Sequence, residues 1–211
     1  MGDEAAREQR RATVDGVKRE IIRAAAKKVF AEAGLDRASV REIARAAGYT
    51  TGAIYFHYAG KEALYADLVS QSLDGLQRAV GTAAAGAGGP VATVTAAFRA
   101  MAGFYDEHPR DLELSLYLLQ GMRPRGLSPA LNRELNAKLM AVLAVFRAAL
   151  ARAGVADARL DLVVAALFSQ IIGTLVAAHT GRLRLIGVDL DAVVAHHVAS
   201  IEDRLLPDAR P

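Results

Sequence analysis

Residues 39–58 combine the side chains and the spacing with which a helix can bind DNA. Arg41 can donate two parallel hydrogen bonds to guanine, the most frequent specific contact to a base. Thr50 and Thr51 place short hydroxyl groups where a helix would begin, within reach of phosphate oxygens or thymine methyl groups. Gly52 and Ala53 follow them, and their small size allows the backbone to approach DNA closely. The chemistry of this stretch is therefore binding to nucleic acid.

The chain offers few groups for covalent catalysis or metal binding. It has no cysteine, which excludes thiolate nucleophiles, and no Gly-x-Ser-x-Gly elbow. His196 and His197, with Glu202 and Asp203 nearby, lack a metal-binding spacing such as His-Glu-x-x-His, and we interpret them as part of a solvated or interface helix. The glycines within 86–89 follow a predicted helix and not a strand, which argues against a phosphate loop. We expect no catalytic residue, no metal and no cofactor.

Capping signals predict the two short helices that carry the DNA-binding chemistry. Ser39 stands three residues before Glu42, the pattern of a capping box, and predicts a helix that ends near Ala47. Gly48 can adopt a left-handed conformation, and Thr50 can cap a further helix over residues 51–57. Together they predict a helix–turn–helix, in which the second helix can enter the major groove.

A longer helix precedes these two. Apolar positions recur at helical spacing from Asp15 to Ala33, and Gly34 is a plausible end. Residues 1–13 are polar and charged, which favours a loose arm and excludes a secretory signal. The side chains expected to face inward and to close a three-helix unit are Ile43, Ala44, Ala47, Ile54 and Tyr58.

The remaining chain predicts an all-α protein with no strand. Further helices are predicted over residues 60–80, 91–106, 109–120, 128–153, 157–179 and 189–206. Residues 81–90 are rich in glycine and alanine and predict a loop. Charge is uneven along this plan: residues 1–62 hold 12 Lys and Arg against 9 Asp and Glu, whereas residues 63–211 are neutral. All the excess positive charge therefore lies on the segment with the candidate DNA-binding helix.

The stretch from Ser39 to Leu64 resembles the amino-terminal signature of the TetR family of transcriptional regulators. The resemblance rests on Ser-Val-Arg-Glu-Ile-Ala, then Ala-Gly-Tyr-Thr-Thr-Gly-Ala-Ile-Tyr-Phe-His-Tyr, then Lys-Glu-Ala-Leu. It implies that Tyr55, His57 and Lys61 donate to backbone phosphates. The residues expected to contact DNA are then Ser39, Arg41, Thr50, Thr51, Gly52, Ala53, Tyr55, His57 and Lys61.

Three positions depart from the family pattern. Thr51 replaces a long polar residue, so affinity for phosphate or base is expected to be lower there. Gly60 replaces the usual serine cap before Lys61, which weakens the start of the following helix. Tyr58 stands where phenylalanine is usual, and its hydroxyl must find a partner or reach solvent.

The resemblance also implies a division into a DNA-binding domain, residues 1–60, and an effector-binding and dimerisation domain, residues 61–211. In this interpretation the protein is a cytoplasmic repressor that a small, largely apolar effector releases from DNA. The side chains expected to line the effector cavity are Phe98, Met101, Phe104, Tyr105, Tyr117, Met140, Phe168 and Gln170. A helical enzyme or small-molecule-binding protein with an incidental helix–turn–helix remains the alternative.

Two further expectations concern the last long helices. In the family they form a dimer interface, which implies a homodimer bound to a palindromic operator. The run 162–178 has no charged residue and is nearly long enough for a membrane span. Its polar and small residues favour a helix buried at a subunit interface instead, and Leu175→Asp is expected to split the dimer.

Overall fold

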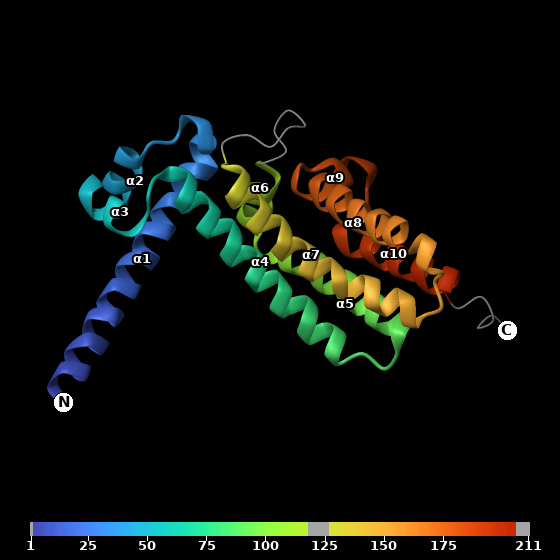
Figure 1. Cartoon of the computed structure of the whole chain (residues 1–211). Helices are drawn as coiled ribbons and strands as arrows, with labels where there is room; N and C mark the ends of the chain where they lie inside the picture. The colour runs from blue at the N-terminus through green and yellow to red at the C-terminus, as the bar shows by residue number, and fades with distance from the viewer. Residues whose placement is uncertain (1, 118–126, 206–211) are drawn as a thin grey trace. The chain divides into compact units, whose positions relative to one another are not determined.

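The computed structural model describes residues 2–117 and 127–205, and every regular element within them is an α-helix (Figure 1). In chain order the elements are α1 (Gly2–Arg37), α2 (Val40–Ala47), α3 (Thr51–His57), α4 (Lys61–Ala85), α5 (Pro90–Glu107), α6 (Pro109–Tyr117), α7 (Pro129–Arg152), α8 (Asp157–His179), α9 (Arg182–Ile186) and α10 (Leu190–Leu205). The predicted all-α fold is confirmed.

The helices form two compact units. The first comprises Met1–Gln71 with Arg110–Glu134 and so contains α1, α2, α3, the beginning of α4, α6 and the first residues of α7. The second comprises Ser72–Pro109 with Leu135–Pro211 and contains the rest of α4, α5, most of α7 and α8 to α10. The predicted domains, residues 1–60 and 61–211, describe a division of function and stay a prediction.

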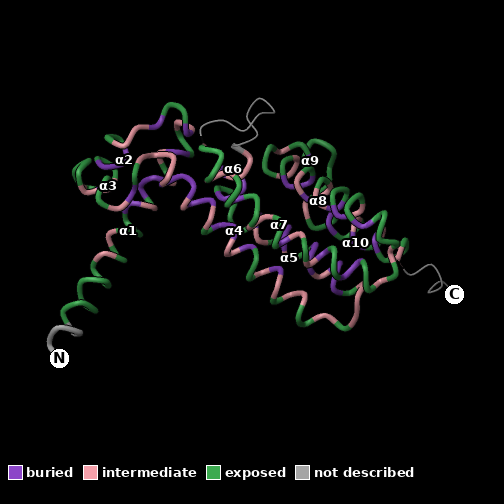
Figure 2. The backbone as a smooth tube through the Cα atoms, in the orientation of Figure 1, coloured by how far each residue is buried: buried purple, intermediate pink, exposed green. Residues whose placement is uncertain are grey.

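Apolar side chains at helical spacing build a separate core in each unit. The purple segments of the backbone in Figure 2 mark the buried residues. In the first unit α1, α2, α3 and α4 contribute side chains with at most 3% exposure: Ile22, Phe30, Ile43, Ile54 and Leu64. In the second unit α5 packs on α8 and α10. The core there includes Phe98, Met101, Phe146, Ile171, Leu175 and Val198, each at most 2% exposed. The hydrophobic effect thus holds each unit together by its own interior.

Two expectations about element bounds were wrong, and one helix was missed. Residues 2–13 are helical and not a loose arm, since the alanines, arginines and glutamates there are good helix formers. Helix α4 continues through Gly81 to Ala85, because the alanines that follow the glycine favour helix, so the loop shrinks to residues 86–89. Helix α9 was not expected; it lies between Gly181 and Gly187, both of which have positive φ.

The first helix was predicted to end at Gly34, and the helical path is indeed interrupted there, although α1 continues to Arg37. Gly34 has φ 73° and ψ 165°, which interrupts the helical path before the last residues of α1. Helices α2, α3 and α8 have the predicted bounds to within a residue.

Candidate nucleic-acid interface

Helix α2 begins at a complete capping box. The backbone N–H of Glu42 donates to the Ser39 hydroxyl at 3.2 Å, and the Glu42 carboxylate accepts from the Ser39 N–H at 2.9 Å and from its hydroxyl at 2.7 Å. These hydrogen bonds lower the pKa of Glu42. Ile43 and Ala44 are buried on the inner side of α2, which packs on α1. The predicted capping box is confirmed, and the Ser39 hydroxyl is engaged within the protein.

A tight turn then redirects the chain into α3. Gly48 has φ 70° and ψ 27°, and the N–H of Tyr49 donates to the Ala44 carbonyl at 2.9 Å. The Thr50 hydroxyl accepts from the N–H of Ala53 at 3.3 Å and caps α3. Ile54 is fully buried and fixes the inner side of α3. The predicted helix–turn–helix geometry is therefore present.

The outer side of α3 presents polar and aromatic side chains to solvent. Tyr55 is 58% exposed and Phe56 is 71% exposed. Thr51 and Gly52 are also exposed, and His57 is half-buried. An exposed face of this kind on a helix held by caps and one buried isoleucine is suited to contact with a macromolecule.

The other residues predicted to contact DNA lie around this face. Arg41 is exposed on α2, and Ala53 is half-buried on α3. The Lys61 ammonium donates to the carbonyls of Asp36 at 2.9 Å and Ala38 at 3.0 Å. It therefore ties the start of α4 to the connection between α1 and α2, and two of its three N–H groups are used. A phosphate contact by Lys61 stays a prediction, as do the other individual contacts.

A partly buried polar network holds the end of α3 and was not foreseen from the sequence. The Tyr58 hydroxyl donates to the Asp67 carboxylate at 2.7 Å, and the same oxygen accepts from Arg23 Nε at 2.7 Å. Burial and the bond to Asp67 raise the pKa of Tyr58 to about 12, so the phenol stays a donor. Burial opposes ionisation of Asp67, but the hydrogen bonds from Arg23 and Tyr58 outweigh it and lower its pKa.

This network joins three elements of the first unit. Arg23 belongs to α1, Tyr58 follows α3, and Asp67 belongs to α4. The expectation that the Tyr58 hydroxyl needs a partner is met by Asp67. The sequence showed only that Tyr58 carries a hydroxyl that needs a partner. Arg23 and Asp67 are 35 and 9 residues away and lie on different helices, so only the fold identifies them.

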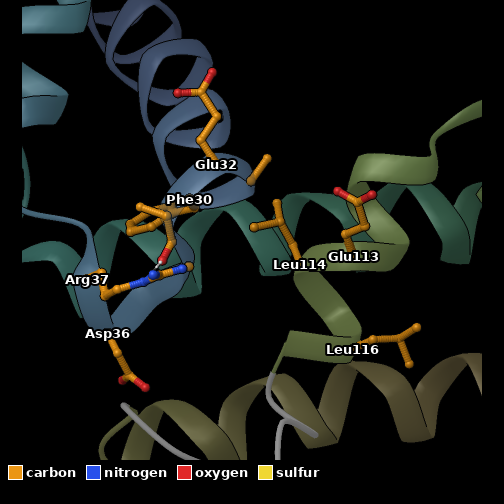
Figure 3. Close-up of a pocket in the computed structure, with 10 residues that line it drawn as sticks. Phe30, Glu32, Asp36, Arg37, Glu113, Leu114 and Leu116 are labelled. Atoms are coloured by element: carbon orange, nitrogen blue, oxygen red, sulfur yellow. Dashed lines mark hydrogen bonds between the residues drawn. The ribbon is translucent and has the colours of Figure 1, made fainter.

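Helix α6 packs on the helix–turn–helix unit through polar contacts that the sequence did not reveal. Lys27 of α1 forms an ion pair with Asp111, and the Tyr65 hydroxyl of α4 donates to the Leu114 carbonyl. A pocket of about 690 Å³ lies beside these contacts. Figure 3 shows its walls, with Phe30, Glu32, Asp36 and Arg37 at the carboxyl end of α1 and Glu113, Leu114 and Leu116 on α6. A displacement of α6 would therefore act directly on α1 and α4.

The residues predicted to line an effector cavity are dispersed within the second unit. Phe98, Met101 and Tyr105 are buried along α5. Phe104 is half-buried, and its ring stacks on His108 with centroids 4.7 Å apart. Met140 is 63% exposed on α7. Three of these side chains therefore lie together in the core, and Met140 lies away from it.

The remaining three predicted effector residues differ in their surroundings. Phe168 is half-buried on α8. Gln170 lines a groove of about 640 Å³ with apolar residues from α7, α8 and α10 and with Arg159 and Arg204. The side chain of Tyr117 lies outside the part of the chain that the structure describes. The cavity itself stays a prediction.

Helices α8 and α10 each carry a row of exposed, largely uncharged positions. On α8 the exposed positions recur every three or four residues: Leu162, Ala165, Ala166, Ser169, Gly173 and Val176. On α10 the exposed positions Ala192, Ala195, His196 and Ala199 follow the same spacing. By length and composition alone α8 could also span a membrane, and a third of its most apolar window is buried inside the second unit. An exposed stripe of small residues suits close packing with another helix.

The chain is similar to known regulators over its amino-terminal part. Residues 22–68, which run from α1 through α4, match the family described as bacterial regulatory proteins, tetR family. The match covers the capping box, the turn at Gly48 and all of α3.

Solved structures share the fold over most of the chain. A bacterial regulatory protein in the tetR family from Rhodococcus RHA1 has a TM-score of 0.72 at 21% identity, with 87% of this chain and 94% of that chain covered. The TetR-family transcriptional regulator PfmR from Thermus thermophilus has 0.67 at 22%, covering 90% and 99%. The transcriptional regulator FadR from Bacillus subtilis, solved in complex with stearoyl-CoA, has 0.68 at 18%, covering 86% and 96%.

Proposed function

We propose that this chain is a regulator of the TetR family, whose model residues 22–68 match, and that it represses transcription by binding a palindromic DNA operator as a homodimer. The single observation that carries the proposal is α3, capped by Thr50, anchored by Ile54 and exposing Tyr55 and Phe56. A helix fixed on its inner side and open on its outer side can enter the major groove without rearrangement.

We assign separate tasks to the polar groups of this interface. Arg41 reads a base from the exposed side of α2, whereas Tyr55 and His57 donate to phosphates. The N–H groups at the start of α3 offer further donors to phosphate, because the amino end of a helix favours anions.

The exposed stripe on α8 and α10 supports a homodimer. In the proposed dimer the stripe packs on the same stripe of a second copy, so Leu162, 69% exposed, becomes buried. Two-fold symmetry then presents two copies of α3 to successive turns of the major groove. A cytoplasmic location agrees with binding to chromosomal DNA.

We further propose that an effector with an apolar chain controls release from DNA. A regulator of the same fold was solved with stearoyl-CoA, which supports an acyl thioester as the class of effector. The contacts of α6 with Lys27 and Tyr65 offer a route from effector to α3, because they join α6 to α1 and α4. An effector that prefers the released state by about 3 kcal/mol would shift the balance about 150-fold.

Selection of bound fragments from random duplex DNA tests the core of the proposal. The expected result is a palindromic consensus whose half-sites lie about one helical turn apart. If no sequence is enriched and the purified protein binds no duplex even at low ionic strength, the proposal is wrong. Adding stearoyl-CoA to the complex, with coenzyme A alone as control, tests release by an acyl thioester.

Two variants separate phosphate contacts from base contacts. Tyr55→Phe is expected to weaken binding to every sequence to the same extent and to leave the salt dependence unchanged, since a neutral hydroxyl donates to phosphate without releasing counterions. Arg41→Ala is expected to relax the preference at one base pair by about 1–3 kcal/mol. Both are measured by fluorescence anisotropy on the selected site and on its single-base variants. An unchanged affinity of Tyr55→Phe, or an unchanged base preference of Arg41→Ala, would remove the corresponding assignment.

A further inference from the structure

The amino-terminal half of α1 forms a groove with the outer side of α3. Arg10, Arg11 and Lys18 of α1 line this groove together with Phe56 and His57 of α3, and its volume is about 540 Å³. All of these residues belong to the first unit. Residues 7–14 of α1 are exposed, as the green segment next to the amino terminus in Figure 2 shows. The groove is therefore an open surface next to the helix that we propose enters DNA.

The charge of this groove is predominantly positive. Arg10, Arg11 and Lys18 bring two guanidinium groups and one ammonium group, and the only acidic residue in the lining is Asp15. Asp15 lies 3.9 Å from the Lys18 ammonium, so its charge is offset locally. A polyanion is the ligand that complements such a surface.

The second wall of the groove is continuous with the proposed DNA-binding face. Ala53 and His57 belong both to the groove and to the residues expected to contact DNA. Phe56, which is 71% exposed, meets the His57 ring edge-on with centroids 4.9 Å apart. A strand of DNA that follows α3 would therefore reach the cations of α1 without leaving the protein surface.

We propose that this groove binds the sugar–phosphate backbone of the duplex whose major groove α3 enters, with Arg10 and Arg11 as the phosphate ligands. The inference rests on the proposed function and adds a second contact surface to it. Arginine suits the task because its planar guanidinium donates two hydrogen bonds to one phosphate. The contact adds affinity and salt dependence but no sequence preference.

The test is the salt dependence of binding to a fluorescein-labelled, mixed-sequence duplex long enough for two reading helices. Arg10→Gln/Arg11→Gln is compared with the parent and with Arg99→Gln/Arg152→Gln, which removes the same charge from exposed positions of the second unit. We expect the first variant to lower the slope of log affinity against log salt by about 2 per bound protomer, at about 0.9 for each lost phosphate contact. The control is expected to keep the parental slope. Circular dichroism checks that both variants keep the helix content of the parent.

The outcomes separate the inference from the proposed function. If the parent binds duplex and the Arg10/Arg11 variant has the parental slope, the inference is overturned and the proposed function stands. If both double variants lose the same slope, the effect is one of net charge and the groove is not a DNA contact. If the variant loses binding to anionic phosphatidylglycerol vesicles but not to duplex, the surface faces lipid and the inference fails. A parent that binds no duplex contradicts the proposed function itself.

Discussion

Helices α2 and α3 and helices α8 and α10 reach their exposed surfaces by different physical routes. In the first pair, hydrogen bonds between residues a few positions apart set each helix end, from the Ser39–Glu42 box to the Thr50 cap. In the second pair, the Asp189 carboxylate accepts from the Ala192 N–H at 2.8 Å and caps α10, but no side-chain cap bond starts α8, whose inner side carries buried residues such as Ile171 and Leu175. Local signals therefore define the surface proposed to read DNA, whereas the face of α8 proposed for dimerisation depends on packing.

Helices α2 and α3 can be displaced together while their exposed surface keeps its shape. The caps, Gly48 and Ile54 keep α2 and α3 in a fixed relation to each other. Tyr58, Asp67 and Arg23 then link this pair to α1 and α4. Because these contacts join the pair to α4, a displacement of the start of α4 would be passed on to α3.

The largest expected effect comes from Leu175, which is buried within the second unit, and is compared with that of Leu162, which is proposed to be buried only between two copies of the chain. Leu175 is 0% exposed, so Leu175→Asp places an unpaired charge in the core and is expected to cost more than about 4 kcal/mol of folding stability. Leu175→Asp is therefore expected to unfold the second unit and not, as the sequence suggested, to split a dimer. Leu162→Asp, at a position 69% exposed, is the variant expected to give a folded monomer.

Light scattering after gel filtration and urea unfolding measure these two effects. Met140→Asp is the control, because Met140 is a 63% exposed apolar side chain on α7. It is expected to leave both the mass and the stability unchanged. A Leu162→Asp protein that keeps the mass of a dimer would place the interface elsewhere.

The next effect tests whether the turn before α3 depends on backbone conformation alone. Gly48 has φ 70°, and a Cβ there would meet nothing within 4 Å. Gly48→Ala is therefore expected to cost about 1–2 kcal/mol through backbone strain. Gly16→Ala is the matched control: the site has equal space but a helical backbone, so alanine is expected to stabilise by about 0.5–1 kcal/mol.

Thermal and urea unfolding of both glycine variants give the comparison. A loss of the same size at Gly16 and Gly48 would show that the left-handed conformation is not the cause.

A smaller effect is expected from the network that holds the end of α3. Tyr58→Phe removes the hydroxyl that donates to Asp67 and keeps the buried ring, so the expected cost is about 1 kcal/mol. Arg23 still pairs with Asp67 in this variant. Urea unfolding measures the cost, and anisotropy measures DNA affinity, which is expected to fall because α3 is held less firmly. Stability equal to the parent would mean that water replaces the bond without cost.

The smallest effect concerns pH and belongs to the second unit. His197 bonds to the Thr174 hydroxyl at 3.1 Å and lies against Phe98. Burial, followed by the charges of His196 and Arg204, lowers the pKa of His197 below its ordinary value. Below about pH 6.5 the unfolded chain binds a proton at this site that the folded chain resists. Stability is therefore fully present above that pH and falls as the pH drops towards the lower folded pKa.

Urea unfolding of parent and His197→Asn at neutral and mildly acidic pH tests this sign. The variant is expected to lose part of the pH dependence, whereas His108→Asn, at an exposed position, is the control. If the stability of His197→Asn depends on pH as steeply as that of the parent, the His197 imidazole is not the source of the pH dependence.

Much of the reading surface could be predicted because its determinants are local. Ser39 with Glu42, Gly48 and Thr50 are separated by a few residues and act through hydrogen bonds that form within one helical turn. The same reasoning failed for residues 2–13, where polarity suggested a loose arm but helix propensity prevailed. It also failed for the bonds of Lys61, whose carbonyl partners lie 23 and 25 residues away.

The sequence by itself determined the all-α class, the helix–turn–helix and the excess positive charge on it, because capping, periodicity and charge are properties of neighbouring residues. Only the tertiary structure decided that Tyr58 meets Asp67, that α6 packs on α1 and α4, and that Leu175 is buried while Leu162 is exposed. The apolar pattern of α8 was compatible with a core, an interface or a membrane. Residues distant along the chain decide which of these three roles α8 has, since the burial of a side chain depends on which other helices cover it.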